Sequence, residues 1–259
     1  MSDPGRDAGG GGETGESDGA INGARPPLLE LIDVHAAYGP FRALFGVSLT
    51  VREGSAVALL GSNGAGKSTV ARVASGLLPV TSGRIRFAGK EVTGRRAYQF
   101  AQLGMAHAPE GRSVFASLTV EENLTLPFRR SLGRAGVPAA LDRAYTAFPR
   151  LGERRYQSGG TLSGGEQRML SLAAVLVNPP RLLIVDELSL GLAPVLIDEV
   201  FRTLTAIRDE GTSLLVVEQH VGRALSLADD AVLLSKGQVA QSGPIEELGE
   251  ALATLPGPQ

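Results

Sequence analysis

The chain alternates between short apolar runs and longer mixed segments, with glycine at several of the boundaries. Short apolar runs of this kind predict β-strands. They occur at 28–38, 46–51, 55–60, 83–88, 104–108, 181–187 and 212–217. Other segments predict helices, at 67–78, 119–127, 139–148, 163–177, 194–208 and 221–228. A final pair of strands is expected to meet in a hairpin turn at Lys236 and Gly237.

The order of these elements predicts an α/β fold built on a parallel sheet. The third apolar run is followed by a glycine-rich loop and then by a helix, which is the order that a parallel α/β unit requires. Thr119 and Glu122, three residues apart, form the pattern of a capping box at a helix start. We expect a parallel-sheet core formed by 28–110 and 178–245, interrupted by a helical insert at 111–177.

Residues 1–27 differ in character from the rest of the chain. They are rich in glycine, with scattered acids and almost no bulky apolar side chain. Such a segment cannot bury enough apolar surface to offset the entropy lost on ordering. We expect a disordered tail that is a passive extension, with a docking or regulatory arm as the alternative.

Composition places the chain among ordinary globular proteins. Its 259 residues are 43% hydrophobic and 20% charged, which suits one large α/β domain or two coupled subdomains. The formal net charge of −2 disfavours nucleic acid as a partner, because binding a phosphate backbone calls for an excess of Lys and Arg. Cysteine is absent, which excludes disulfides and thiolate chemistry and suits a reducing cytosol. No apolar run reaches the roughly 18 residues that span a bilayer, and no secretory signal is present, so we expect the chain to stay in the cytoplasm.

The loop after the third apolar run carries the pattern G-x-x-x-x-G-K-S. Glycines let the backbone wrap closely around an anion, and consecutive N–H groups at a helix N-terminus face negative charge. The lysine of this motif reaches the β- and γ-phosphates, and the serine ligates Mg²⁺. The loop lies between an apolar strand and a helix, which is the context that the motif requires. We therefore predict a nucleoside triphosphate site formed by Gly61, Ser62, Asn63, Gly64, Ala65, Gly66, Lys67, Ser68 and Thr69.

Two carboxylates follow another buried strand. The apolar run at 182–185 stops at Asp186 and Glu187, and open α/β sheets bind ligands at the carboxyl ends of their strands. Asp186 is expected to hold Mg²⁺ through water. Glu187 is expected to polarise the attacking water beside the γ-phosphate, a general-base role worth roughly 10²–10⁴ in rate. Two acids that end a strand would by themselves suit a solvent-facing loop equally well, but the nearby phosphate motif favours the catalytic interpretation.

A third motif opens the helix before the acidic strand. Residues 162–167, which we call the signature segment, have the sequence LSGGEQ, and such a helix start offers free N–H groups and a positive dipole end to an anion. The segment resembles the LSGGQ signature of ABC ATPases, and the resemblance extends over about 28–250. It implies that the signature segment caps the γ-phosphate of ATP bound to a second, facing subunit, so that two ATPs join a dimer. The residues concerned are Ser163, Gly164, Gly165 and Glu166.

The resemblance also implies a fold and its ligands. Residues 28–259 would form a P-loop NTPase of the ABC ATPase type, with a RecA-like parallel-sheet core, an N-terminal antiparallel β subdomain and a helical subdomain insert. The implied ligands are ATP and Mg²⁺.

Four further positions match the family's pattern or depart from it. Tyr38, 23 residues before the glycine loop, matches the aromatic residue that stacks on adenine, with a packing tyrosine as the alternative. Glu110 stands where most relatives carry a Gln that contacts Mg²⁺ and senses the membrane subunits. Relatives also use a His that contacts the γ-phosphate. Here the spacing favours Gln219, a neutral hydrogen-bond donor, at that position and leaves His220 as the alternative.

Several stretches are similar to the ATPases of branched-chain amino-acid importers, namely 109–115, 118–124, 189–194 and 217–219. This resemblance implies a peripheral subunit on the cytoplasmic face of the membrane. Its partners would be a second ATPase subunit, either identical or a sister, and two transmembrane permease subunits. In such importers the permease and an external binding protein select the cargo. The helical insert, with its Arg-containing segment at 128–134, is where the permease's coupling helices are expected.

Three alternatives stay open at this point. The cargo of a urea or short-amide importer would suit a similar ATPase. A soluble ABC ATPase acting on DNA or in iron–sulfur assembly is disfavoured, because only 96 residues separate Lys67 from Ser163, with neither heptads nor Cys between them. A nucleotide-gated module that no longer hydrolyses ATP is disfavoured by the presence of Glu187.

Overall fold

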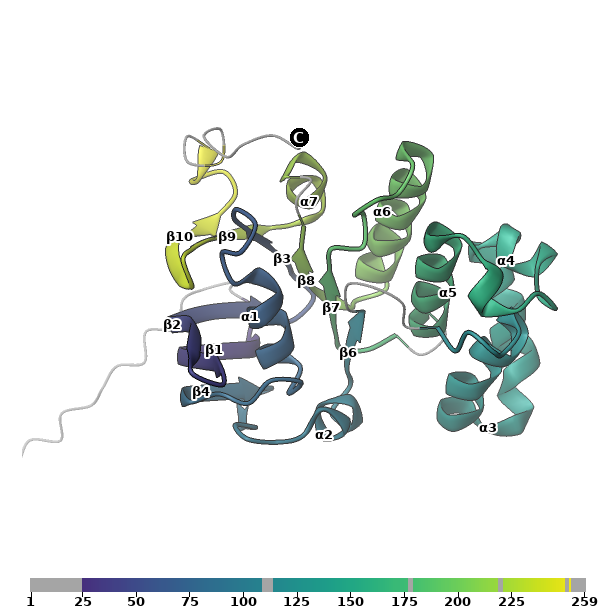
Figure 1. Ribbon diagram of the computed structural model, residues 1–259, viewed down its shortest axis with the longest axis horizontal. Helices are drawn as coiled ribbons and strands as arrows, with labels where there is room; N and C mark the ends of the chain where they lie inside the picture. The colour runs from purple at the N-terminus through teal and green to yellow at the C-terminus, as the bar shows by residue number, and fades with distance from the viewer. Residues whose placement is uncertain (1–24, 109–113, 177–178, 219–220, 250–251, 253–259) are drawn as a thin grey trace, which may run out of the picture.

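A six-stranded sheet forms the centre of the protein (Figure 1). The computed structural model describes residues 25–108, 114–176, 179–218, 221–249 and 252. Among the described strands of this sheet, all run parallel except the edge strand β10. In spatial order the strands are β10 (Gln238–Pro244), β9 (Asp230–Ser235), β3 (Ala56–Leu60), β8 (Ser213–Val217), β7 (Leu182–Asp186) and β6 (Met105–Ala108).

A second, antiparallel sheet from the N-terminal part of the chain packs beside the first. Its strands, in spatial order, are β2 (Phe41–Arg52), β1 (Pro27–Tyr38), β4 (Ser82–Phe87) and β5 (Lys90–Glu91). The helix α1 (Lys67–Ala74) lies between the two sheets and contacts strands of both (Figure 1). The loop that precedes α1 is thereby held at the carboxyl end of the central strand β3.

The central strands are apolar on both faces. In β7, Leu183 and Val185 belong to one buried cluster, whereas Leu182 and Ile184 belong to another on the opposite face. Strands β3 and β8 divide their residues between the same two clusters in the same alternating way. Burying a side chain of this size stabilises the fold by roughly 1.5–3 kcal/mol. A parallel sheet covered on both faces therefore explains why these strands are continuous apolar runs.

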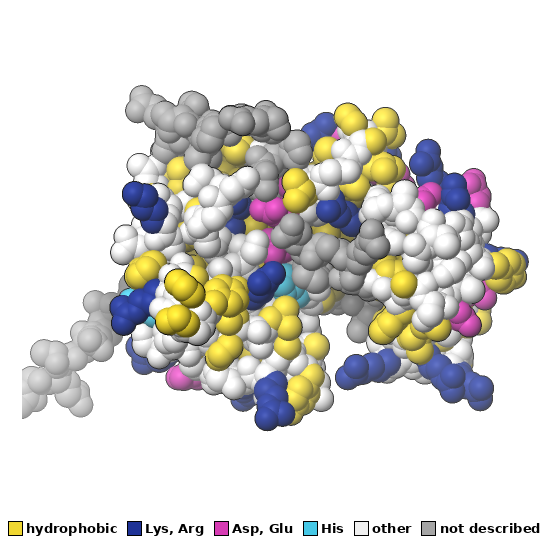
Figure 2. All heavy atoms as spheres, viewed as in Figure 1, with side chains coloured by type: hydrophobic (Ala, Val, Ile, Leu, Met, Phe, Trp, Pro, Cys, Tyr) yellow, Lys and Arg dark blue, Asp and Glu magenta, His cyan; other side chains and the backbone are white. Residues whose placement is uncertain are grey.

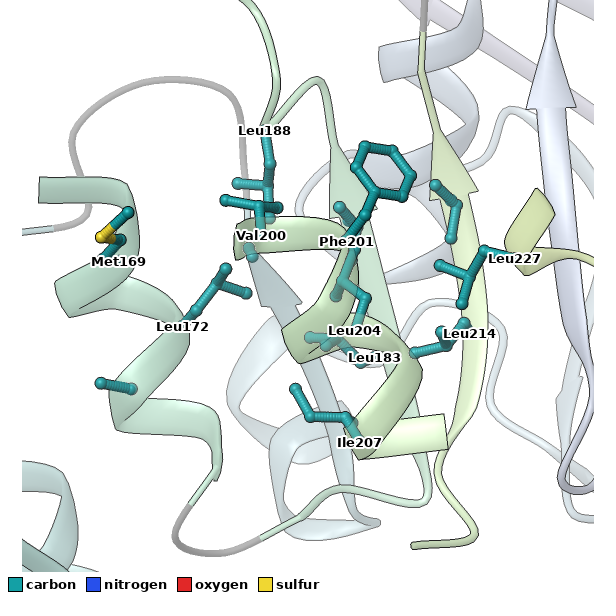
Figure 3. Packing of buried hydrophobic residues seen from close by; sticks show 14 of the residues in the cluster. Met169, Leu172, Leu183, Leu188, Val200, Phe201, Leu204, Ile207, Leu214 and Leu227 are labelled. Carbon is teal, nitrogen blue, oxygen red and sulfur yellow. The ribbon is translucent and has the colours of Figure 1, made fainter. Parts of the chain in front are cut away.

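Helices cover the face of the central sheet opposite α1. They are α5 (Gly164–Leu176), α6 (Pro194–Asp209) and α7 (Val221–Leu227). Figure 3 shows side chains of these helices and of β7 and β8 gathered in one apolar cluster, among them Leu172, Leu204 and Leu183. The apolar stripe of α6, with Ile197, Val200 and other buried residues, accounts for its orientation against the sheet.

The remaining helices extend the molecule beyond the β6 edge. Helix α3 (Val120–Ala147) packs against α5 and against α4 (Pro149–Glu153). A short 3₁₀ turn (Gly159–Thr161) follows α4. Helix α2 (Ala97–Gln102) contacts β6. Figure 1 shows α3, α4 and α5 side by side, apart from the antiparallel sheet. Within the described part of the chain, no helix has the length and apolar character to cross a membrane.

The predicted fold class is confirmed, and several element boundaries differ. The helix expected at 67–78 ends at Ala74, because Gly76 has φ +70° and a Cβ there would lie 2.5 Å from the Phe100 ring. The two helices expected within 119–148 are one element whose helical geometry is interrupted at Gly133 (φ 71°, ψ 179°). Helices α2 and α4 were not expected, since each is only about one turn or slightly more. The part of the predicted tail before residue 25 lies outside the described residues, while Pro27 already begins β1.

His107 of β6 is a half-buried histidine that joins the sheet to the end of α1. Its Nδ1 lies 2.9 Å from the Ser75 hydroxyl, which itself donates to the Ala71 carbonyl, so Nδ1 carries the proton of this bond. No partner for Nε2 is found among the described residues. Burial, and to a smaller extent the charge of Arg72, lowers the pKa of His107 to about 4.

We expect His107 to make the folded state sensitive to acid. The unfolded chain takes up a proton near pH 6.5, but the folded chain does so only near pH 4, so the free energy of unfolding falls as the pH drops between these values. The loss attributable to this residue is on the order of 2–3 kcal/mol. Urea unfolding of wild type and His107→Gln at pH 7, 5.5 and 4.5 measures it. A constant difference between the two proteins across this range would contradict the prediction.

Candidate functional site

The loop between β3 and α1 needs glycine at two positions for steric reasons. Gly61 has φ +154°, and a Cβ there would lie 2.3 Å from the carbonyl oxygen of Leu234. Gly66 has φ +104° as the residue before α1. The loop is also tied to the β9–β10 turn, because the Gly237 N–H donates to the Ala65 carbonyl at 2.8 Å. These contacts hold the loop in an open curve with the N-terminus of α1 at its end.

The two polar side chains at the start of α1 point to different partners. Lys67, almost fully buried, donates from Nζ to the carbonyls of Gly61 (3.0 Å) and Ser62 (3.2 Å). The Ser68 hydroxyl donates to Asp186 Oδ1 at 3.0 Å. The structure therefore brings the predicted lysine, serine and first carboxylate together, although they come from elements more than 100 residues apart.

The second carboxylate is held in an unusual backbone conformation. Glu187 has φ +49°, a left-handed value that is costly for a residue with a side chain. Its N–H donates to the Val217 carbonyl at 2.8 Å, which prolongs the pairing of β7 with β8 past the strand end. Its Oε1 lies 3.8 Å from Lys67 Nζ. The carboxylate therefore faces the group that is expected to meet the terminal phosphate.

A cavity of about 710 Å³ opens over these residues. Of the residues predicted from the motifs, it is lined by Asn63, Gly64, Gly66, Lys67, Ser68, Thr69 and Glu187. Residues of the lining that the motifs did not indicate are Arg42, Ala43, Phe45, Leu190, Lys236 and Gly237. With the glycine loop at one wall and three basic side chains in the lining, the cavity is suited to a polyanion.

The predicted adenine-stacking residue lies outside this lining. Tyr38 is 41% exposed, and its hydroxyl accepts a hydrogen bond from Arg72 at 3.3 Å. The aromatic ring that does line the cavity is Phe45 of β2. Stacking by Tyr38 stays a prediction. No local sequence signal distinguished Phe45 from Tyr38 and Phe41, the other aromatic residues shortly before the glycine loop.

The signature segment forms a second, separate feature. Ser163 and Gly164 are exposed at the start of α5, and none of the predicted signature residues lines the cavity. Gly165, by contrast, is buried, and a Cβ there would lie 2.5 Å from Leu196 Cδ1. The exposed tip of α5 is therefore available to a ligand that the same chain's cavity does not hold.

Glu166 holds the tip of α5 in shape. It accepts the Ser163 N–H at 2.8 Å, its own N–H donates to the Ser163 hydroxyl at 3.3 Å, and Arg154 Nε lies 3.0 Å from its other oxygen. Burial alone would raise the pKa of Glu166, but the hydrogen bonds from Ser163 and the charge of Arg154 outweigh it, so the pKa lies below its usual value. Glu166 was predicted to bind nucleotide, and the structure also shows it as a cap of its own helix.

Three predicted site residues, Glu110, Gln219 and His220, lie outside the described residues. Their roles stay predictions, as does the choice between Gln219 and His220.

The fold and the cavity together define a class of protein: an α/β nucleotide-binding protein whose glycine loop precedes a helix and whose two acids, Asp186 and Glu187, end another parallel strand of the same sheet. The family model described as ABC transporter matches residues 44–189, and the chain belongs to this family. The resemblance found in the sequence is thereby confirmed.

Similar proteins cover almost the whole chain. The high-affinity branched-chain amino acid transport ATP-binding protein BraG of Pseudomonas aeruginosa is 40% identical over 88% of this chain and 96% of its own. The probable branched-chain amino acid transport ATP-binding protein LivF of Archaeoglobus fulgidus is 37% identical over 86% of this chain and 94% of its own. A solved structure of an ATP-binding subunit of an ABC transporter superimposes with a TM-score of 0.77 at 27% identity, covering 88% of this chain and 94% of that one.

We expect Lys67→Ala to weaken ATP binding by on the order of 3 kcal/mol, because it removes one preorganised charged donor from the cavity. Isothermal titration of the purified chain with ATP measures the effect. Lys90→Ala, which removes an exposed lysine of β5, is the matched control and should bind as wild type does. Equal affinities for the two variants would exclude Lys67 as a phosphate ligand.

Proposed function

We propose that this chain is the ATP-hydrolysing subunit of an importer of branched-chain amino acids and works as a dimer on the cytoplasmic face of the membrane. The proposal rests on the observation that the predicted site residues lie at two separate places on the chain. Lys67, Ser68 and Glu187 share one cavity, while Ser163 and Gly164 are exposed elsewhere on the same chain. A site divided in this way is completed when a second subunit presents its α5 tip to the cavity.

The residues present fit a bound Mg²⁺. Ser68 and Asp186 place a hydroxyl and a carboxylate oxygen 3.0 Å apart, and this hard cation prefers such oxygen ligands together with phosphate oxygens and water. Ser68 would contact the ion directly and Asp186 through water. When bound, the ion offsets the negative charge of the phosphates.

Hydrolysis is assigned to the residues at the cavity floor. Lys67 would release the carbonyls of Gly61 and Ser62 and bind the β- and γ-phosphates, since the ammonium gains more from a phosphate than from two neutral acceptors. Glu187 would accept a proton from the attacking water beside the γ-phosphate. The left-handed backbone of Glu187 supports this role, because strained residues cluster at functional sites.

The permease partner is assigned to a groove beside the helical part of the molecule. The groove has a volume of about 520 Å³ and lies between β6, α3 and α5. Phe115, Leu126 and Arg130 line it, and the first two are exposed apolar side chains. Figure 2 shows the surface hollowed between the parts over α2 and α3. An apolar groove with a basic rim suits a short helix of a membrane subunit.

The cargo is proposed from the similar proteins. BraG and LivF are both named as ATP-binding proteins of branched-chain amino acid transport, and both align over most of this chain. The nucleotide site itself contains nothing that would recognise an amino acid outside the membrane. The cargo is therefore selected by the permease subunits and the external binding protein.

We expect Glu187→Gln to bind ATP as tightly as wild type, to lose on the order of 10²-fold or more in turnover, and to form a dimer in the presence of ATP. The amide keeps the shape of the carboxylate but cannot accept the proton, so ATP stays unhydrolysed and the ATP-bound dimer persists. Phosphate release and size-exclusion chromatography with light scattering measure the two effects.

Glu153→Gln, on an exposed face of α4, is the matched control and should hydrolyse ATP at the wild-type rate without a trapped dimer. Near-normal turnover of Glu187→Gln would remove Glu187 as the base, and a Glu187→Gln protein that stays monomeric with ATP would contradict the divided site.

We expect leucine, isoleucine and valine to stimulate turnover of the complete importer. The chain would be reconstituted in vesicles with its permease subunits and binding protein, and phosphate release would be measured with each candidate cargo. Urea and a short amide serve as comparisons. Stimulation by urea or the amide without stimulation by leucine would replace the proposed cargo.

A further inference from the structure

Arg168 connects the signature helix to the loop that carries Glu187. It lies in the second turn of α5, and its Nη1 donates to the carbonyl of Leu188 at 2.7 Å and also to the carbonyl of Leu190. Both carbonyls belong to the segment between β7 and α6, which continues past Asp186, the last paired residue of β7. One guanidinium group therefore holds two successive turns of this segment against α5.

A close backbone approach makes the same connection independently. The Cβ that a larger residue would have at Gly165 would lie 2.5 Å from Leu196 Cδ1 and 3.2 Å from Leu192 Cδ2. The start of α5 is therefore packed against Leu192 of this segment and against Leu196 in the first turn of α6. Figure 3 shows Leu188 of this segment in the same apolar cluster as Met169 of α5.

The other side of the segment is held by β8. The Glu187 N–H donates to the Val217 carbonyl at 2.8 Å, and the Ser189 N–H donates to Glu218 Oε1 at 3.0 Å. The Ser189 hydroxyl donates to the other oxygen of Glu218. Ser189 and Glu218 are both almost completely buried. The segment that begins at Glu187 is thus held by Val217 and Glu218 on one side and by Arg168 on the other.

We infer that Arg168 is a positioning residue for hydrolysis: it couples the tip of α5 to the conformation of Glu187 in the same chain. The inference rests on the proposed function, in which that tip caps a nucleotide held by the facing subunit. When the tip is anchored there, the guanidinium fixes the carbonyls of Leu188 and Leu190, and the left-handed backbone of Glu187 is held in place. Each cavity would then reach full activity only when the facing cavity is filled.

The chemistry of the side chain explains why an arginine suits this role. A planar guanidinium can donate in a fixed geometry to two carbonyl oxygens at once, whereas an apolar side chain of the same length can donate to neither. Without these bonds, Glu187 would keep its N–H bond to Val217 and Ser189 its bonds to Glu218, but the segment would lose its restraint on the α5 side. Misplacing a catalytic group slightly reduces the rate of the chemical step more than it reduces substrate binding.

Turnover of Arg168→Met, Arg168→Lys and wild type as a function of ATP concentration tests the inference. We expect Arg168→Met to lower kcat by about tenfold or more with KM little changed, and to bring the Hill coefficient toward one. Arg168→Lys should restore part of kcat, since an ammonium can still donate to both carbonyls. Arg202→Met, which removes an arginine that donates to the Asp198 carbonyl within α6, is the matched control and should behave as wild type.

A second measurement separates positioning from folding. In a Glu187→Gln background, Arg168→Met should lower the residual turnover by no more than about twofold, because the group that it positions is already inactive. A kcat of Arg168→Met equal to that of wild type would overturn the inference, and so would a full additional loss in the Glu187→Gln background. If wild type itself released no phosphate, the proposed function would fail instead, so the two failures are distinguishable.

Discussion

Burial of the central sheet on both of its faces is the constraint on which the rest of the structure depends. Strands β3, β7 and β8 are apolar on both faces. One face packs against α1 and the antiparallel sheet, and the other packs against α5, α6 and α7. This packing determines the register of the strands and where each strand ends. The carboxyl ends of the three strands then lie at one edge. The glycine loop, the acidic pair and Glu218 all emerge there, although the chain reaches these strands in widely separated segments.

The site built on this edge combines rigid and strained parts. The glycine loop is held by steric fit at Gly61 and by the hydrogen bond from Gly237, so its shape does not depend on a ligand. Glu187, by contrast, is kept in a left-handed conformation by hydrogen bonds on both sides of the segment that follows it. Strain of this kind persists only where the surroundings over-determine it. Contacts that restrain this segment are therefore in a position to control catalysis.

Within the described part of the chain, two arginines link the helical part of the molecule, α3 to α5, to the α5 tip and to the segment after Glu187. Arg154 reaches Glu166 at the α5 tip, and Arg168 reaches the segment after Glu187. Both arginines act over several residues of backbone, so a small displacement of α5 would alter the tip and the acidic pair together. The groove between β6, α3 and α5 is lined in part by α5, the helix that carries Arg168, so a permease segment bound there as proposed would contact the helix that is linked to the Glu187 segment.

The amino-acid sequence by itself determined the fold class and the order of the main elements, and it predicted the phosphate loop, Asp186, Glu187 and the signature segment as site residues. These features are local: each depends on residue types at fixed short spacings, and short spacings are preserved whatever the rest of the chain does. The sequence did not predict the helix end near Gly76, the interruption of α3 at Gly133, or the short helices α2 and α4. Short elements and helix ends depend on packing against residues far away in the chain, such as Phe100. Only the tertiary structure decided that Phe45, Arg42 and Lys236 line the cavity and that Arg168 and Glu218 clasp the segment after Glu187. No spacing rule relates these residues, since their proximity arises from the folding of separate strands and helices onto one sheet edge.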